Sequence, residues 1–246
     1  MSFETKNKDL PFFVHAIIPW LILPFLFFLY KTDFQAFHDA LAKDRGEKAW
    51  ATIVEHLTVA ILIPGIIMGT VALIFNRSSE LLSDVKLKVW ITLSVLACVY
   101  FAGEEASWGQ WYFGWATPDS LKEINDQQET NLHNTSSWFD QKPRALVEAG
   151  IYIGGFIWPL LYRFKKIDLK KPFLKAIVPT YACFSCASLV ILIRILEKID
   201  FTNPFFKRLT DTSELREYFI AIFLCYYLLS YWSRSRTTQT NTEATS

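Results

Sequence analysis

The uncharged stretch from Pro11 to Tyr30 constrains this chain more than any other feature. A bilayer core requires about 20 consecutive, mostly apolar residues per helix, because it holds no water to satisfy an exposed backbone. A second stretch, from Leu57 to Asn76, also lacks a formal charge. Hydrophobic residues make up 52% of the chain, which includes 21 Phe. This pattern predicts an integral membrane protein.

Four further stretches approach the length of a membrane span. They are Val89 to Gly103, Ala145 to Tyr162, Ala176 to Ile193 and Tyr218 to Ser233. The predicted fold class is therefore all-α, with six transmembrane helices and a long motif-bearing loop, residues 104–144, between helices three and four. Residues 1–233 are expected to form a single membrane domain. Residues 234–246 are rich in Thr and Ser and are predicted to be a disordered polar tail.

Charge and cysteine usage exclude other classes of protein. Only 20% of the residues are charged and the net charge is +1, so we expect no nucleic acid as a partner. The four cysteines, Cys98, Cys183, Cys186 and Cys225, all lie in apolar stretches. Cysteines in such places are usually small buried hydrophobes, which argues against a disulfide framework and against a thiolate metal site.

The connecting segments differ in charge on the two predicted membrane faces. Six spans place both termini on one face, whose short loops and tails are dense in Lys and Arg. Such segments usually remain in the cytoplasm. We therefore expect a protein of the cell inner membrane with both termini cytoplasmic.

Acidic residues occur at the opposite ends of five predicted spans. They are Glu55, Glu104 with Glu105, Glu148, Glu197, and Glu214 with Glu217. Charges at the membrane are costly unless they are paired or line a wet cavity, so we expect these side chains to face one another. Arg194 is expected to pair with Glu104 or Glu217.

The long loop begins with GEEASWGQWYFGW, from Gly103 to Trp115. If the helix continued past Gly103, Glu104, Ser107 and Trp108 would share one stripe. Thr117 followed by Pro118 predicts a capped, short interfacial helix. The segment QQETNLHN, from Gln127 to Asn134, follows and is crowded with hydrogen-bonding side chains.

The strings GEEASWGQ, GWATP and ETNLHN resemble the motif set of a family of uncharacterised multi-pass bacterial membrane proteins. The match covers Gly103 to Asn134 in order and spacing, and elsewhere only the hydrophobic spans agree. Trp111 departs from the family, where an Arg is usual. The resemblance implies a shared polar site and implies no reaction.

The candidate site comprises eight motif residues. They are Glu104, Glu105, Ser107, Gln110, Glu129, Asn131, His133 and Asn134. Paired Glu104 and Glu105 in a pocket of low dielectric constant would suit acid or base catalysis, with His133 as counterpart. Ser107 is a weaker candidate nucleophile, because its surroundings lack the G-x-S-x-G elbow. His133 and Glu129, with Glu104 or Glu105, would alternatively provide three ligands for a metal.

The motifs leave several functions open. A polar pocket at the depth of the lipid headgroups predicts a membrane lipid or lipid-linked substrate and an embedded hydrolase or transferase. The alternative is a non-catalytic assembly or transport component, in which the same side chains only satisfy helix ends and the loop. The sequence leaves the cofactor, the metal and the oligomeric state undecided.

Overall fold

The structure is a computed structural model that describes residues 10–41, 52–75, 80–125, 129–132, 135–165, 169–211 and 213–243. These residues form helices and connecting segments, and no β-strand occurs among them. The all-α class predicted from the apolar stretches is therefore confirmed for the described part of the chain.

Within the described residues, four helical segments are long and apolar enough to cross a membrane. The first, Phe12–Thr32, consists of α1 (Phe12–Ala16), the 3-10 turn η1 (Ile18–Leu21) and α2 (Ile22–Thr32). The second and third are α4 (Ile53–Phe75) and α5 (Val85–Glu105). The fourth, Lys142–Phe164, spans α8 (Ser137–Gly150), the π-helical segment η5 (Ile151–Ile157) and α9 (Trp158–Lys165). Each begins or ends within a few residues of a predicted span.

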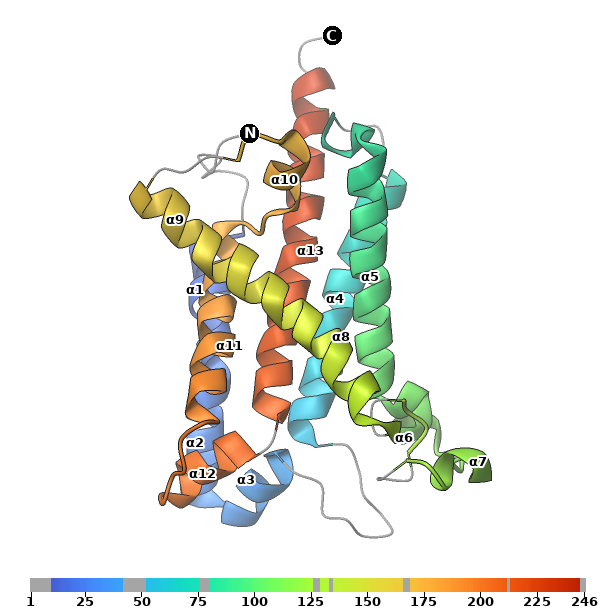
Figure 1. Cartoon of the computed structure of the whole chain (residues 1–246), viewed down its shortest axis with the longest axis vertical. Helices are drawn as coiled ribbons and strands as arrows, with labels where there is room; N and C mark the ends of the chain where they lie inside the picture. Colours follow the sequence, from blue (N-terminus) through green and yellow to red (C-terminus); the bar gives the residue numbers. More distant parts are fainter. Residues whose placement is uncertain are drawn as a thin grey trace.

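Two further helices overlap the remaining predicted spans. The fifth predicted span begins at Ala176, inside α10 (Pro172–Ile177), and residues 178–180 are not helical. The 3-10 turn η6 (Tyr181–Cys183) continues into α11 (Phe184–Leu196), which is apolar but shorter than the four candidate spans. The last helix, α13 (Glu214–Glu243), is long and contacts α4, α5 and α11. Figure 1 shows α13 in the middle of the bundle, with α8 and α9 crossing it obliquely.

Two tyrosines of α13 bind the end of a neighbouring helix. The Tyr227 hydroxyl donates to the backbone oxygen of Ile177 at 2.6 Å, and the Tyr231 hydroxyl donates to that of Ala176 at 2.8 Å. Both acceptors lie in the last turn of α10 (Pro172–Ile177), whose carbonyl groups lack partners within the helix. A central helix thus uses polar side chains to fix a neighbouring helix end.

Close contact between α4 and α13 depends on small residues. A Cβ atom on Gly65 would lie 2.8 Å from the Cα atom of Cys225, and one on Gly69 would lie 3.2 Å from a methyl carbon of Leu228. Two glycines four residues apart allow helix backbones to approach closely, as in other membrane bundles. This packing brings α4 and α13 close together along the middle of the bundle.

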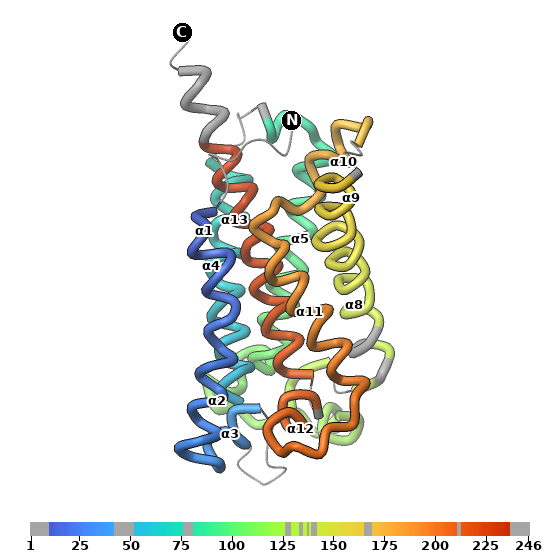
Figure 2. Tube along the Cα trace, turned by 90° about the vertical axis from the view of Figure 1, so that its left-hand side faces the viewer, coloured from blue at the N-terminus to red at the C-terminus, as the bar shows by residue number. Residues whose placement is uncertain are grey.

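The short helices gather at the two ends of the bundle. One end, called the loop end below, carries α3 (Phe34–Leu41), α6 (Gln110–Phe113), α7 (Asp119–Lys122) and α12 (Pro204–Asp211). The other end carries the 3-10 turn η2 (Glu80–Ser83) and α10. Both views place these groups at opposite ends (Figures 1 and 2). The first turn of α4, the last turn of α5 and the first turn of α13 all lie at the loop end.

Two local predictions are corrected by the structure. The segment predicted to be a disordered tail begins as helix, because α13 continues to Glu243 and Arg234 and Ser235 are buried. The Arg234 guanidinium lies 4.5 Å from the centre of the Tyr231 ring, which favours continued helix. Thr117 does not cap α7, since its hydroxyl accepts a hydrogen bond from Gln110.

Candidate functional site

The backbone turns sharply where α5 ends at Glu105. Ser107 and Trp108 have φ values of 45° and 54°, and Gly109 has a φ of 100°. A left-handed conformation costs an ordinary residue about 1–2 kcal/mol, so neighbouring contacts must hold this turn. The turn ends the helix before Ser107, although Trp108 still contacts Glu104 as predicted. Glu104 and Glu105 both lie within α5 and point into different surroundings, because successive helical residues are rotated by about 100°.

Glu104 fastens the loop to the end of α5. Its Oε1 atom accepts a hydrogen bond from Trp108 Nε1 at 2.6 Å, and its Oε2 atom accepts one from the backbone nitrogen of Leu132 at 2.7 Å. The residue is 3% exposed. Both carboxylate oxygens therefore bind the loop, which gives Glu104 a structural role.

A second set of motif residues forms a closed network of hydrogen bonds, called the loop network below. It consists of Ser107, Asn125, Glu129 and Asn131. Glu129 Oε2 accepts from the Ser107 hydroxyl at 2.8 Å and from Asn131 Nδ2 at 2.7 Å. Asn125 Nδ2 donates to Asn131 Oδ1 at 2.8 Å, and Asn125 Oδ1 accepts from the backbone nitrogen of Glu129. All four side chains are buried.

Gln110 joins the two arms of the loop. Its Nε2 atom donates to Thr117 Oγ1 at 2.8 Å, and its Oε1 atom accepts from the backbone nitrogen of Thr130 at 2.8 Å. Like Glu104, Gln110 uses its polar atoms to hold the loop in place.

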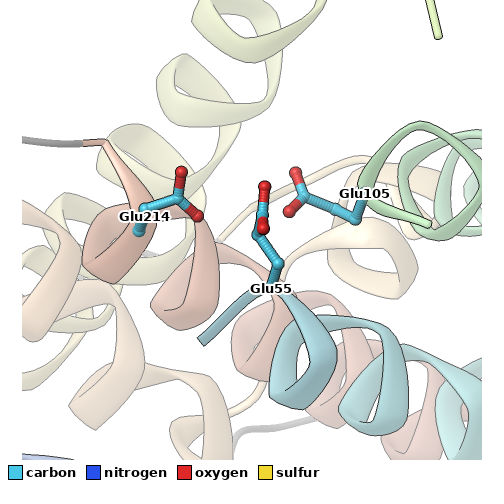
Figure 3. Close-up of side chains that lie close together, drawn as sticks. All are labelled: Glu55, Glu105 and Glu214. Atoms are coloured by element: carbon cyan, nitrogen blue, oxygen red, sulfur yellow. The ribbon is translucent and has the colours of Figure 1, made fainter. Parts of the chain in front are cut away.

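Glu105 belongs to a different group of side chains. Carboxylate oxygens of Glu55, Glu105 and Glu214 all lie within 4.8 Å of one another, and these residues come from α4, α5 and α13. Figure 3 shows the three carboxylates pointing toward a common centre. Glu217, one turn further along α13, also lies close to Glu105. These four residues are called the acidic cluster below.

The positions of these glutamates along their helices differ in an important way. Glu55 lies in the first turn of α4, where it forms a capping box with Thr52, and Glu214 and Glu217 lie in the first turn of α13. A helix N-terminus stabilises a negative charge, whereas a C-terminus does not. Glu105 is the last residue of α5. Its charge is therefore the least supported of the four.

Protons or a cation must neutralise part of this cluster. Like charges at such separations repel one another strongly in a medium of low dielectric constant. Three carboxylates from three helices also have the number and spacing of oxygen ligands for a metal ion. This group shares only Glu105 with the predicted metal ligands, since Glu129 is committed to the loop network.

Arginines pair with Glu217 of the acidic cluster and with two further acids, Glu148 and Glu197. Arg144 of α8 forms an ion pair with Glu217. The guanidinium of Arg216 lies 3.3 Å from a Glu148 oxygen and 2.9 Å from a Glu197 oxygen. Arg194 also pairs with Glu197, at 3.0 Å, so its predicted pairing with Glu104 or Glu217 is wrong. The helix-end acids do gather, in two groups with different partners.

A cleft with a volume of about 130 Å³ opens beside the acidic cluster. It lies between α5, α8 and α13. Its lining comprises Ala97, Tyr100, Phe101, Glu104, Glu105, Pro143, Arg144, Val147, Glu217, Ile220 and Leu224. The charged residues occupy the loop end of this lining and the apolar residues extend toward the middle of the bundle.

Tyr112 and His56 lie next to the cluster on the side of the loop. The Tyr112 hydroxyl is 3.2 Å from His56 Nδ1. Burial, and then the nearby carboxylate of Glu55, raise the pKa of Tyr112 above its usual value. This pair connects the loop to the first turn of α4.

The predicted site residues divide into three sets. Ser107, Glu129 and Asn131 meet in the loop network, with Glu104 and Gln110 holding the adjacent backbone. Glu105 faces the acidic cluster and the cleft. His133 and Asn134 lie outside the described residues. The site prediction missed Asn125 of the loop network. It also missed Glu55, Glu214, Glu217 and Arg144, although the acidic residues at the ends of the predicted spans indicated the three glutamates.

No protein-family model matches the chain, and comparisons with curated proteins and with solved structures found no significant match. The resemblance carried by the three motif strings stays a prediction.

Proposed function

We propose that the chain is a six-span membrane protein with both ends in the cytoplasm. The four candidate spans, α11 and α13 run alternately in opposite directions through the bundle (Figure 1). Basic residues flank the end opposite the loop, including Lys86, Lys88, Arg163 and Lys175. That distribution supports a cytoplasmic location for this end and an outward-facing loop end.

We further propose that the cleft admits a membrane lipid or a lipid-linked substrate. The observation that carries this proposal is the division of the cleft lining into an apolar part and a charged part. Between Glu217 and Leu224 the lining follows α13 for two turns, which is about 10 Å. An amphiphile in one leaflet has the same arrangement, with its polar group at the surface and its chain toward the middle of the membrane.

Glu105 is the candidate acid or base for chemistry on that substrate. Carboxyl groups as close as those of Glu55, Glu105 and Glu214 cannot all be ionised, so at least one of them carries a proton. We place this proton on Glu105, because the α5 C-terminus does not support a negative charge. Glu105 lines the cleft and is thus positioned to exchange a proton with the polar group of a bound molecule.

A metal-assisted form of this function uses the same residues. Glu55, Glu105 and Glu214 would supply oxygen ligands to a divalent cation, which would act as a Lewis acid at the polar end of the cleft. Elemental analysis of the purified protein separates the two forms, since only the metal-assisted form predicts a stoichiometric divalent ion that is lost from Glu105→Ala.

A non-catalytic membrane component is the second candidate. The loop network favours it, because Ser107, Glu129 and Asn131 use one another as partners. If this candidate is correct, the cleft is a packing defect and the motif serves only to fold the loop.

Lipid analysis tests the proposed function. Lipids would be compared between a strain lacking the chain, the same strain carrying the wild type, and one carrying Glu105→Gln. We expect a lipid that accumulates in the deletion strain, disappears with the wild type, and accumulates again with Glu105→Gln at equal protein level. Identical lipid profiles in all three strains would support the non-catalytic candidate instead.

A further inference from the structure

The charged part of the cleft is strongly unbalanced. Three carboxylates line it, from Glu104, Glu105 and Glu217, whereas Arg144 is the one guanidinium in the lining. Arg144 is already engaged, because it pairs with Glu217. Glu55 and Glu214 add two carboxylates directly behind Glu105. An anionic group entering this cleft would meet repulsion and no uncommitted cation among the lining residues.

A positively charged group would meet the opposite situation. Buried carboxylates bind a cation more strongly than surface carboxylates do, because little water competes for them. Such a group would take over from protons the neutralisation of the acidic cluster. The apolar lining formed by Ala97, Val147, Ile220 and Leu224 requires that the same molecule carry a hydrocarbon chain.

We propose that the cleft binds an amphiphile whose headgroup is a cationic nitrogen, with its ammonium group at Glu105 and its chain along α5 and α13. This inference rests on the proposed function and names the headgroup class of its substrate. It follows from the cleft lining and its charges, and it excludes a purely anionic lipid as the preferred ligand.

Three ligands with the same tail test the headgroup class. The purified full-length protein in neutral detergent would be titrated with dodecylamine, dodecanol and dodecyl sulfate by calorimetry, with a chelator present to remove metal ions. At neutral pH the amine is protonated, since the pKa of an alkylamine is about 10. Ala97→Trp fills the apolar part of the cleft. The heat measured with this variant is the background that does not come from binding in the cleft. We expect the amine to bind at least about tenfold more tightly than the alcohol, and the sulfate to bind most weakly.

Two substitutions with opposite expected signs sharpen the test. Glu105→Gln should weaken amine binding about tenfold and leave alcohol binding unchanged, so the alcohol titration also verifies that the variant is folded. Arg144→Gln should tighten amine binding, because it removes the positive charge that repels the ligand. Glu123→Gln, an exposed carboxyl on the loop, is the matched control and should change neither titration.

The outcomes distinguish this inference from the proposed function. If the alcohol or the sulfate binds as tightly as the amine, the headgroup inference is overturned and the amphiphile-binding function stands. If no ligand gives a binding heat in the wild type that is absent in Ala97→Trp, the headgroup inference and the amphiphile-binding function are both overturned. Equal weakening of amine and alcohol by Glu105→Gln would also contradict the assignment of the ammonium group to Glu105.

Discussion

The loop network and the acidic cluster lie at the same end of the bundle, but they use carboxylates in opposite ways. In the loop network, Glu129 accepts hydrogen bonds from Ser107 and Asn131, so a buried charge is matched by donors. In the acidic cluster, Glu55, Glu105 and Glu214 bring acceptors to one point. The first arrangement stabilises a fold, whereas the second requires something else to neutralise it.

This contrast teaches that two adjacent residues of one motif can serve different purposes. Glu104 and Glu105 are neighbours in the chain, but Glu104 binds the loop and Glu105 faces the cleft. The left-handed turn at Ser107 and Trp108 directly follows them and folds the loop back onto Glu104. Substitution of Glu105 in the acidic cluster should therefore reduce function, whereas substitutions in the loop network should reduce stability.

The largest effect is expected at Glu105. Glu105→Gln keeps the shape of the side chain but cannot exchange a proton, so turnover of the lipid that accumulates in the deletion strain should fall about 100-fold or more. The measurement is the rate of conversion of that lipid by purified protein, normalised to folded protein. Glu123→Gln should keep the wild-type rate. Full activity in Glu105→Gln would contradict the assignment of Glu105 as the acid or base.

Asn131→Ala should have the next largest effect, and on stability. It removes a donor to the buried Glu129 carboxylate and an acceptor for Asn125, which should cost about 2–3 kcal/mol. Thermal unfolding in detergent measures this loss. Thr130→Ala is the control, because its buried hydroxyl has no hydrogen-bond partner among the described residues. Equal unfolding temperatures for Asn131→Ala and Thr130→Ala would contradict the stabilising role of the loop network.

Gly109→Ala should destabilise the turn by a smaller amount, about 1–2 kcal/mol. Gly109 has a φ of 100°, and a Cβ atom there would lie 2.9 Å from the Trp115 ring. Gly114→Ala makes a useful comparison, because Gly114 has a φ of 71° and nothing lies within 4 Å of its added Cβ. Chemical unfolding of both variants should show the greater loss for Gly109→Ala. The reverse order would mean that the turn does not depend on this contact.

The smallest effect concerns pH. Burial and Glu55 raise the pKa of Tyr112 above the value of the unfolded chain. The folded protein thus holds this proton where the unfolded chain has lost it, so stability falls as the pH rises from about 10 toward the folded pKa. Tyr112→Phe should lessen this alkaline loss and leave stability at neutral pH nearly unchanged. Unfolding temperatures measured across the alkaline range check the difference, and parallel curves for the two proteins would contradict it.

Much of the fold could be predicted from hydrophobic stretches alone. The uncharged stretch from Pro11 to Tyr30 corresponds to Phe12–Thr32, and the stretch from Leu57 to Asn76 corresponds to most of α4. The extension of α13 past Ser233 was not predictable from hydropathy, because Arg234 and Arg236 stay in the helix by lying over the rings of Tyr231 and Trp232.

The site was only partly predictable. The motif strings identified Ser107, Glu129 and Asn131 of the loop network but not Asn125, since a loop rich in Asn, Gln and Glu must satisfy its polar groups locally. The return of the loop onto Glu104 depends on positive φ angles at Ser107 and Trp108, which sequence patterns do not indicate. Arg144 could not be assigned to Glu217 without knowing how α8 crosses the bundle.

Thermal unfolding of Glu105→Ala and Glu129→Ala, purified in the same neutral detergent, tests the division between the two regions most directly. Loss of the Glu129 carboxylate leaves buried donors unsatisfied and should lower the unfolding temperature by about 5 °C or more. Loss of Glu105 removes one of the crowded carboxyl groups of the acidic cluster, so the unfolding temperature of Glu105→Ala should stay at or above that of the wild type. An equal or larger decrease for Glu105→Ala would show that the acidic cluster holds the fold together and would contradict its assignment as the functional site.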